Sequence, residues 1–482
     1  MIKIQRLFVP CLSGLMLLTH VQAAGRSNAG PLFDEFPLTL SAGHRTEALG
    51  PFFYSEQKEN QKTWAIPPLF SHEMDPDTDS EEYDFGYPVL TYDRFGKEYR
   101  WQLFQLLSFA GGQNQREQTA RRFTLFPIYF QQRSDDPAEN YTAFIPFYGH
   151  LKHRLSRDEI FFVMFPIYSQ TRKADVVTDN YLFPFFHVRH GDRLTGWQIW
   201  PIVGHEHKDV TTATNGFGDV SIIGGHDSRF VLWPFFFDVQ SGIGTDNPRK
   251  QQALLPFYST LRSPKRDSTT VLWPFISHAT DREKNYTEWD TPWPLIVFAR
   301  GEGKTTSRVW PFYSHAANTN LESNFVLWPL YKYNRVHSDP LDRERTRILF
   351  FLYSDTRQKN TATGAFRHRV DFWPFFTHQR DYDGSARLQI LSILEPFLPT
   401  NKSVERDYSP VYSFWRQERN AKTGAASQSL FWNLYRRETT PDSRKCSLLF
   451  GLFQYQSGSD GRRLRLFYVP VGHKTKTAPG TD

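Results

Sequence analysis

The chain has 482 residues, with 57 Lys and Arg against 51 Asp and Glu, 2 Cys, and 16% aromatic residues. This aromatic content excludes a disordered chain, and two cysteines exclude a disulfide framework. The net charge of +6 is small for the length. It gives no basic surface of the kind that nucleic-acid binding needs, so we expect no nucleic-acid partner.

The N-terminus is typical of a segment that directs export. Lys3 and Arg6 precede a mostly apolar stretch, residues 7–18, and a small-residue cleavage site ends at Ala23. We therefore predict a Sec signal peptide over residues 1–23. Cleavage there leaves Cys446 as the one cysteine of the mature chain, so no intramolecular disulfide can form. The rest of the chain lacks the apolar run of about 18 residues that a membrane-spanning helix requires.

A short aromatic phrase containing proline recurs along the remaining chain with a period of about 20 residues. One copy reads Leu272-Trp273-Pro274-Phe275-Ile276-Ser277. We interpret the Trp-Pro pairs as structural anchors of the repeat, because their number exceeds chance. They are Trp200-Pro201, Trp233-Pro234, Trp273-Pro274, Trp293-Pro294, Trp310-Pro311, Trp328-Pro329 and Trp373-Pro374.

Each repeat is interpreted as one strand followed by one turn. The apolar phrases are rich in β-branched and aromatic residues, which strands favour, and the stretches between them carry Asp and Gly, which turns favour. The proline stands in the middle of the phrase, where it cannot donate to a β-ladder, so we expect a bend or bulge in each strand at that point. Both faces of such a strand would be apolar at the centre.

These observations predict an all-β fold, an antiparallel meander of about 22 strand-turn units with a Trp/Phe-Pro phrase, closed into a large barrel. A soluble β-repeat array is the alternative, and apolar residues on both strand faces favour it. A propeller or another closed scaffold for an enzyme is a third architecture. The expected organisation is a signal peptide over 1–23, an N-terminal extension over 24–44, a single β-repeat domain over 45–475 and a polar tail over 476–482.

One segment adds a resemblance. The run Gly216-Phe217-Gly218-Asp219 resembles the Gly-x-Gly-Asp phrase that opens strands in some bacterial outer-membrane β-barrel proteins. The resemblance covers only these residues and the Val220 that follows, and it indicates no specific family. It implies a transmembrane β-strand fold and a location in the Gram-negative outer membrane.

Candidate chemistry is sparse. His205 and His207 would lie on one face of a strand, where two imidazoles could bind a divalent metal, although a polar strand end explains them as well. The motifs of serine hydrolases, zinc proteases and P-loop proteins do not occur. We therefore expect no enzyme activity, no catalytic residues and no cofactor, with His205 and His207 as the only weak metal candidates.

The predicted function is that of an outer-membrane β-barrel, either a passive pore or an envelope scaffold, exported through Sec. Its partners would be outer-membrane lipid and the barrel-assembly machinery. The alternative is a periplasmic or extracellular β-repeat protein with a binding or scaffolding role.

Overall fold

The computed structural model describes residues 29–114, 118–191, 193–214, 216, 219–459 and 461–471. The predicted signal peptide and the predicted polar tail lie outside these residues. The predicted N-terminal extension is described from residue 29 onward, and it contributes strand β1 (Asp34–Pro37) to the main sheet. The described residues form one antiparallel sheet of 43 strands and a separate two-stranded hairpin, which confirms an all-β meander.

The strands are short, and each pairs with its neighbours in chain order. The first part of the sheet contains β1, β2 (Gly43–Ala48), β3 (Phe53–Lys58), β4 (Gln61–Ile66), β5 (Phe70–Asp75), β6 (Ser80–Phe85), β7 (Leu90–Phe95), β8 (Glu98–Leu103), β9 (Leu107–Gln113), β10 (Thr119–Leu125), β11 (Tyr129–Ser134), β12 (Tyr141–Phe144), β13 (Tyr148–Arg154), β14 (Arg157–Val163), β15 (Tyr168–Lys173), β16 (Val176–Tyr181), β17 (Phe186–Gly191), β18 (Leu194–Ile199) and β19 (Val203–Lys208). The separate hairpin is β20 (Thr211–Thr214) with β21 (Val220–Ile223).

The sheet resumes after this hairpin, because β19 pairs directly with β22. The second part contains β22 (Gly225–Val231), β23 (Phe236–Ile243), β24 (Arg249–Leu254), β25 (Tyr258–Arg262), β26 (Arg266–Val271), β27 (Ile276–Asp281), β28 (Tyr286–Asp290), β29 (Ile296–Gly301), β30 (Lys304–Val309), β31 (Tyr313–Asn318), β32 (Leu321–Val326), β33 (Tyr331–Ser338), β34 (Leu341–Ile348), β35 (Tyr353–Asn360), β36 (Phe366–Phe372), β37 (Phe376–Arg380) and β38 (Ala386–Ile390).

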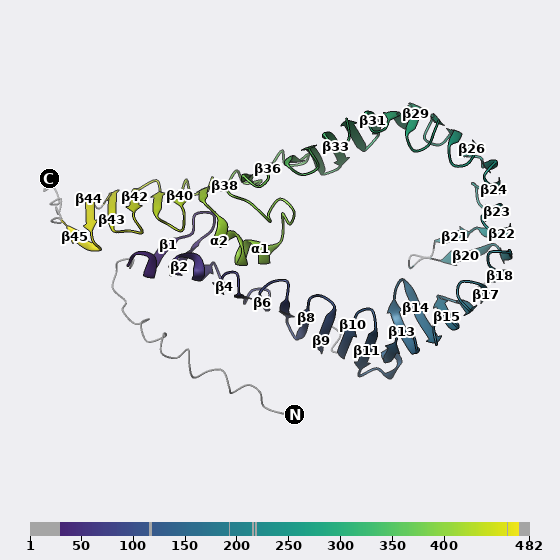
Figure 1. Cartoon of the computed structure of the whole chain (residues 1–482), viewed down its shortest axis with the longest axis horizontal. Helices are drawn as coiled ribbons and strands as arrows, with labels where there is room; N and C mark the ends of the chain where they lie inside the picture. Colours follow the sequence, from purple (N-terminus) through teal and green to yellow (C-terminus); the bar gives the residue numbers. More distant parts are fainter. Residues whose placement is uncertain are drawn as a thin grey trace.

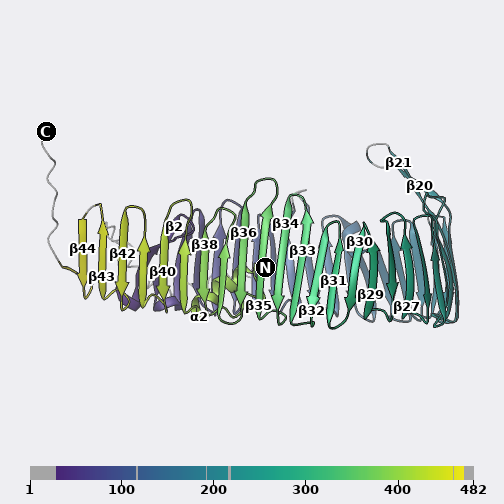
Figure 2. The same cartoon turned by 90° about the horizontal axis from the view of Figure 1, so that it is seen from above.

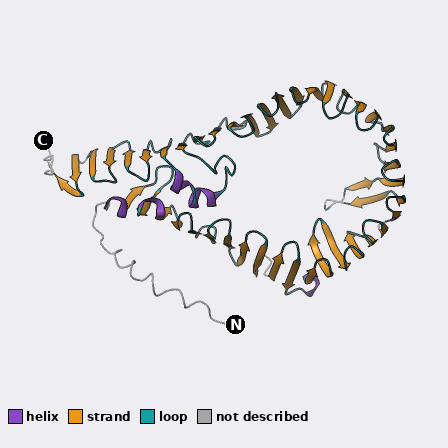
Figure 3. Ribbon diagram, viewed as in Figure 1, coloured by secondary structure: helices purple, strands orange, loops and turns teal. Residues whose placement is uncertain are grey.

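Two short helices interrupt the repeat near its end. They are α1 (Lys402–Asp407) and α2 (Ser409–Tyr412), and the sheet then continues with β39 (Trp415–Arg419), β40 (Ala426–Leu430), β41 (Tyr435–Thr439), β42 (Ser443–Leu448), β43 (Phe453–Gly458), β44 (Gly461–Leu466) and β45 (Val469–Val471). Three single-turn 3-10 helices, η2 (Gly30–Leu32), η3 (Gly50–Phe52) and η4 (Pro137–Glu139), lie between strands. Figure 3 shows how little helix the protein contains.

Each sequence repeat is a hairpin of two strands rather than a single strand. In the copy around Pro274, Val271 ends β26 and faces Ile276 at the start of β27, so the residues between them form the turn. The expected bend within each strand is therefore wrong. The proline phrase reverses the chain instead, because proline has no N–H to give to the ladder and fits a tight turn. This doubles the expected number of strands.

The hairpins give the sheet two chemically different edges. All seven Trp-Pro pairs lie in turns on one edge, and the Asp- and Gly-rich turns, such as residues 76–79 and 381–385, lie on the other. We call the first edge, made of the proline-type turns and the strand residues that flank them, the apolar rim, and the opposite edge the polar rim. Helix α2 marks the apolar rim in Figure 2, and the β20–β21 hairpin projects beyond the polar rim.

The sheet is a ribbon that bends round until its two ends overlap (Figure 1). We call this ribbon, β1–β19 with β22–β45, the belt. Among the described strands, β1 pairs only with β2 and β45 only with β44, so the hydrogen-bonded ladder does not close. Closure depends instead on side chains that meet where the purple and yellow ends lie against each other.

The belt is one layer thick for most of its length. The whole chain has an accessible surface of 31244 Å², whereas a compact globular protein of 56.5 kDa has roughly 19,000 Å². The described apolar core is correspondingly small. One cluster joins Tyr141, Ala143, Leu151 and Phe162 on β12–β14.

Candidate functional site: the contact between the two ends of the belt

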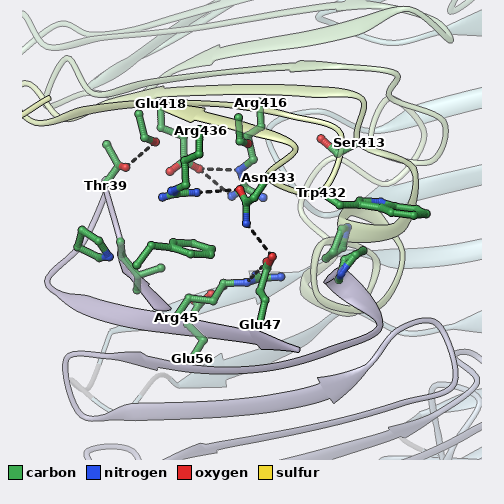
Figure 4. A pocket seen from close by; sticks show the side chains of 17 residues that line it. Thr39, Arg45, Glu47, Glu56, Ser413, Arg416, Glu418, Trp432, Asn433 and Arg436 are labelled. Atoms are coloured by element: carbon green, nitrogen blue, oxygen red, sulfur yellow. Dashed lines mark hydrogen bonds and ion pairs between the residues drawn. The ribbon is translucent and has the colours of Figure 1, made fainter. Parts of the chain in front are cut away.

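The ends of the belt meet around a polar cavity of about 90 Å³ (Figure 4). Strands β1–β3 supply one wall, and α2 with β39–β41 supplies the other. We call the whole contact the clasp; it joins residues 29–87 to residues 391–468. The cavity is large enough for a few water molecules.

Charges of both signs face each other across this cavity. Figure 4 shows Arg45, Glu47 and Glu56 on the N-terminal side and Arg416, Glu418 and Arg436 on the C-terminal side.

Each arginine is paired within its own end of the belt. Arg45 Nε lies 2.8 Å from Glu47 Oε1, and Arg416 Nε lies 2.8 Å from Glu418 Oε1. The charges are therefore largely balanced before the ends meet.

Aromatic rings hold two of these guanidinium groups in place. The Arg45 guanidinium lies 3.7 Å from the centre of the Tyr54 ring, and the Arg436 guanidinium lies 3.6 Å from the centre of the Phe36 ring. Burial disfavours the Glu418 carboxylate, but Arg416 and Arg387 more than offset this and lower the pKa of Glu418 to about 2. The Glu418 carboxyl group is therefore ionised at neutral pH.

Hydrogen bonds from uncharged donors bridge the two ends directly. Thr39 Oγ1 donates to Ser427 Oγ at 2.6 Å, and Asn433 Nδ2 donates to Glu47 Oε2 at 2.9 Å. Asn420 Nδ2 donates to the carbonyl oxygen of Thr39 at 3.1 Å. These groups are buried, so each bond satisfies donors or acceptors that would otherwise be stranded away from water.

Helix α1 places a charged side chain, that of Arg406, inside the clasp. Asn401 caps the helix by accepting a hydrogen bond from the Val404 N–H at 2.9 Å. The helix then places Arg406 against the opposite end of the belt, where only 5% of its surface is exposed. Its guanidinium donates to Ser71 and forms ion pairs with three carboxylates, those of Glu73, Glu82 and Asp84.

Asp407 follows Arg406 and is 1% exposed. Burial raises the pKa of Asp407 to about 7, and the nearby Asp84 carboxylate adds to this rise while Arg406 opposes it. A carboxyl group with an ordinary value of 3.8 thus holds a proton in the closed clasp up to near-neutral pH.

We expect closure of the clasp to weaken as the pH rises from about 4 to about 7. Over that interval the opened form releases the proton of Asp407 while the closed form retains it, so the opened form gains relative stability. The total change would be up to about 4 kcal/mol, with no further change above about pH 7. The other ionisable groups facing Asp407 are Arg406, Asp84, Tyr54 and Tyr408.

The Asp407→Asn variant tests this expectation, because it cannot ionise. Protection of clasp amides from hydrogen exchange should fall with pH in the native protein, after correction for intrinsic rates, and stay level between pH 4 and 7 in the variant. Equal profiles for both proteins would assign the pH dependence to another group.

The two candidate metal ligands lie far from the clasp, on β19. Both contact one carboxylate: His205 Nε2 lies 3.4 Å and His207 Nδ1 lies 3.1 Å from Asp227 Oδ2. Hydrogen bonds to Asp227 and then Asp209 raise the pKa of His207. The residues that the structure describes include no group of three His, Cys, Asp or Glu side chains placed to hold a metal ion.

The seven Trp-Pro anchors are distributed along the apolar rim and form no pocket together. In the run at residues 216–220, Val220 is the first residue of β21, and Phe217 and Gly218 lie outside the described residues. Sequence reasoning missed Arg406 and Asp407. The one signal for them was the broken period between Pro396 and Pro410, where the inserted helices lie.

Comparisons with protein families and curated proteins give no match, so the functional interpretation rests on the structure. Among the described residues, no helix is both long and apolar enough to cross a lipid bilayer.

Proposed function

We propose that the protein is a non-enzymatic scaffold of the Gram-negative cell envelope, exported through Sec, which encircles its contents as a ring closed by the clasp. The observation that carries this proposal is the buried, cross-connected clasp between ends 388 residues apart, as in the bond from Thr39 to Ser427. In an open ribbon the Arg406 side chain would be exposed, because the residues that bury it lie at the other end of the belt.

Of the two predicted outer-membrane roles, the dimensions favour a scaffold over a pore. A transmembrane β-strand needs about 9–11 residues, whereas β26 and β27 have 6 residues each. Most of the exposed apolar side chains also gather at one rim, although some rings, such as Trp197 and Trp289, lie further along the strands. We therefore place the closed belt at the outer membrane, where its partner is lipid.

Two cysteine pairs test closure and export separately. In a Cys446→Ser background, Thr39→Cys with Ser427→Cys replaces two hydroxyl oxygens 2.6 Å apart across the clasp. Thr270→Cys with Ser277→Cys replaces two hydroxyl oxygens 3.2 Å apart on neighbouring strands, away from the clasp. Each variant is expressed with its own N-terminal segment in a Gram-negative host, without added oxidant.

We expect both disulfides to form in cells, because the envelope is oxidising. The clasp disulfide should also change migration on a non-reducing gel strongly, since it links nearly the whole chain into a loop. Formation of the control disulfide without the clasp disulfide would show an exported but open ribbon. Formation of neither would contradict an envelope location. The single variant Thr39→Cys provides the baseline.

A further inference from the structure

The apolar rim is continuous along the belt. Each turn on the apolar rim is flanked by two facing strand residues, which we call the closing pair. From Ile66–Phe70 onward these pairs are apolar or aromatic, as in Leu125–Tyr129, Val231–Phe236, Val271–Ile276, Val309–Tyr313, Ile348–Tyr353, Phe372–Phe376, Leu430–Tyr435 and Leu466–Val469. Thr291, after β28, is the exception.

The side chains of this rim are exposed despite their size. Trp273 is 47% exposed, Trp310 is 44% exposed and Phe312 is 60% exposed. The belt of 43 strands is roughly 200 Å long at the usual strand spacing. A monomeric protein rarely exposes an apolar patch of more than a few hundred Å², so this rim has a partner.

The apolar band is shallow and ends at the same height in most hairpins. The pair next to the closing pair is polar, as in Thr270–Ser277, Arg308–Ser314 and Asp371–Thr377. The band therefore comprises the turn and one residue of each strand, roughly 5–10 Å along the strand direction. Amphipathic segments that lie in a membrane interface bury their apolar side chains to a similar depth, at the boundary between headgroups and acyl chains.

Tyrosine marks the boundary of the band. It is the first residue of eight strands that follow apolar turns, where it is a member of the closing pair, and the Tyr168 hydroxyl donates to Asp179 Oδ1 at 2.9 Å; these strands are β11, β13, β15, β25, β31, β33, β35 and β41. Amphipathic rings at one level are typical of protein surfaces at a membrane–water interface.

The turn residues keep their apolar character but not their shape. The turns Phe126-Pro127-Ile128, Leu255-Pro256-Phe257 and Trp310-Pro311-Phe312 occupy equivalent places. A protein partner would need a matching surface along the whole rim, with a different pocket for each turn. A fluid apolar phase accepts any of these side chains, and the rim runs at one level along the belt in Figure 2.

We infer that the apolar rim inserts into a single phospholipid leaflet, so that the ring stands on the membrane by one edge and the polar rim faces water. This inference rests on the proposed function and deepens it, because it defines how the ring contacts the membrane. Insertion into one leaflet needs no strand long enough to cross the bilayer.

The test compares two tryptophan pairs of similar exposure. The rim variant is Trp273→Ser with Trp310→Ser. The control is Trp197→Ser with Trp289→Ser, whose rings are 45% and 54% exposed but lie two residue pairs inward from the rim, opposite His205 and His278. Purified ring is floated with vesicles of phosphatidylethanolamine and phosphatidylglycerol, and native tryptophan fluorescence is measured with lipids brominated on the acyl chain.

We expect the native protein and the control to float, and the rim variant to lose about tenfold in vesicle partitioning. Brominated lipid should quench the native protein and the control variant more than the rim variant. Circular dichroism and the Thr39–Ser427 disulfide check that the rim variant folds and closes. Equal flotation of both variants, or a native protein that does not float, would overturn the inference.

Association between copies is a separate outcome. A native protein that forms dimers without floating, with dimers lost in the rim variant, would show that a second copy covers the rim and would overturn lipid insertion. Flotation and quenching of the native protein are measured without the clasp disulfide. Failure of membrane binding can therefore be distinguished from failure of ring closure.

Discussion

The Arg406→Gln variant is expected to open the ring. Arg406 is buried and pairs with Glu73, Glu82 and Asp84, whereas Lys402 lies near Glu73 alone. Removal of Arg406 therefore takes away the cation that faces Glu82 and Asp84 in the closed form. Breaking a buried ion pair from one side costs about 3–5 kcal/mol. The opened form gives those carboxylates back to water, so this free energy is lost from closure rather than from the strands.

The yield of the Thr39–Ser427 disulfide measures this effect, and it should fall to the level of the single-cysteine baseline. The matched control is Arg357→Gln, which removes an ion pair to Asp355 on a side chain that is 55% exposed and should change closure by less than about 1 kcal/mol. Undiminished disulfide formation in Arg406→Gln would mean that the other contacts of the clasp close it without Arg406.

The second large effect is expected from Phe162→Ala on β14. The Phe162 ring is 4% exposed and packs on Tyr141, Ala143 and Leu151. It also covers Gly149, where an added Cβ would lie 2.3 Å from Phe162 Cζ. Removing a buried phenyl ring from such a cluster costs about 3–5 kcal/mol.

Hydrogen exchange is the suitable measurement for Phe162→Ala, because units of a repeat protein unfold locally. Protection should fall in β12–β14 and remain unchanged in β33–β36. The control is Phe183→Ala, a rim residue that is 48% exposed and should leave protection in β15–β17 nearly unaltered. A uniform loss along the belt would instead indicate that the whole sheet unfolds as one unit.

The all-β class and the antiparallel meander were predictable from local chemistry. Aromatic and β-branched phrases alternate with Asp- and Gly-rich stretches at a constant period, and the structure confirms strands joined by short turns. The number of strands per repeat was not predictable in this way. Residues such as Leu272, Trp273 and Phe275 favour strands, and turns are expected to be polar because water surrounds them. An apolar turn is unfavourable in water unless another apolar surface covers it.

The clasp could not be predicted, because its partners are related by folding and not by any local pattern. Glu47, Arg406 and Asn433 each stand in ordinary polar surroundings in the sequence. Their pairing depends on how far the belt bends between them, a property summed over all the intervening hairpins. The placement of His205 and His207 on one strand face was simpler, since alternation along a strand fixes it.

The order of strand pairing has a consequence for how the protein is made. Every strand of the belt pairs with a neighbour in sequence or, at β19–β22, across one short hairpin. The contacts that build the sheet are therefore local, and assembly can advance from the first hairpin onward. The Thr39–Ser427 bond cannot form until residue 427 of 482 has been made. We therefore expect a C-terminally shortened protein to yield an unclosed ribbon with intact hairpins, in which size and curvature are normal and only the final joining step is lost.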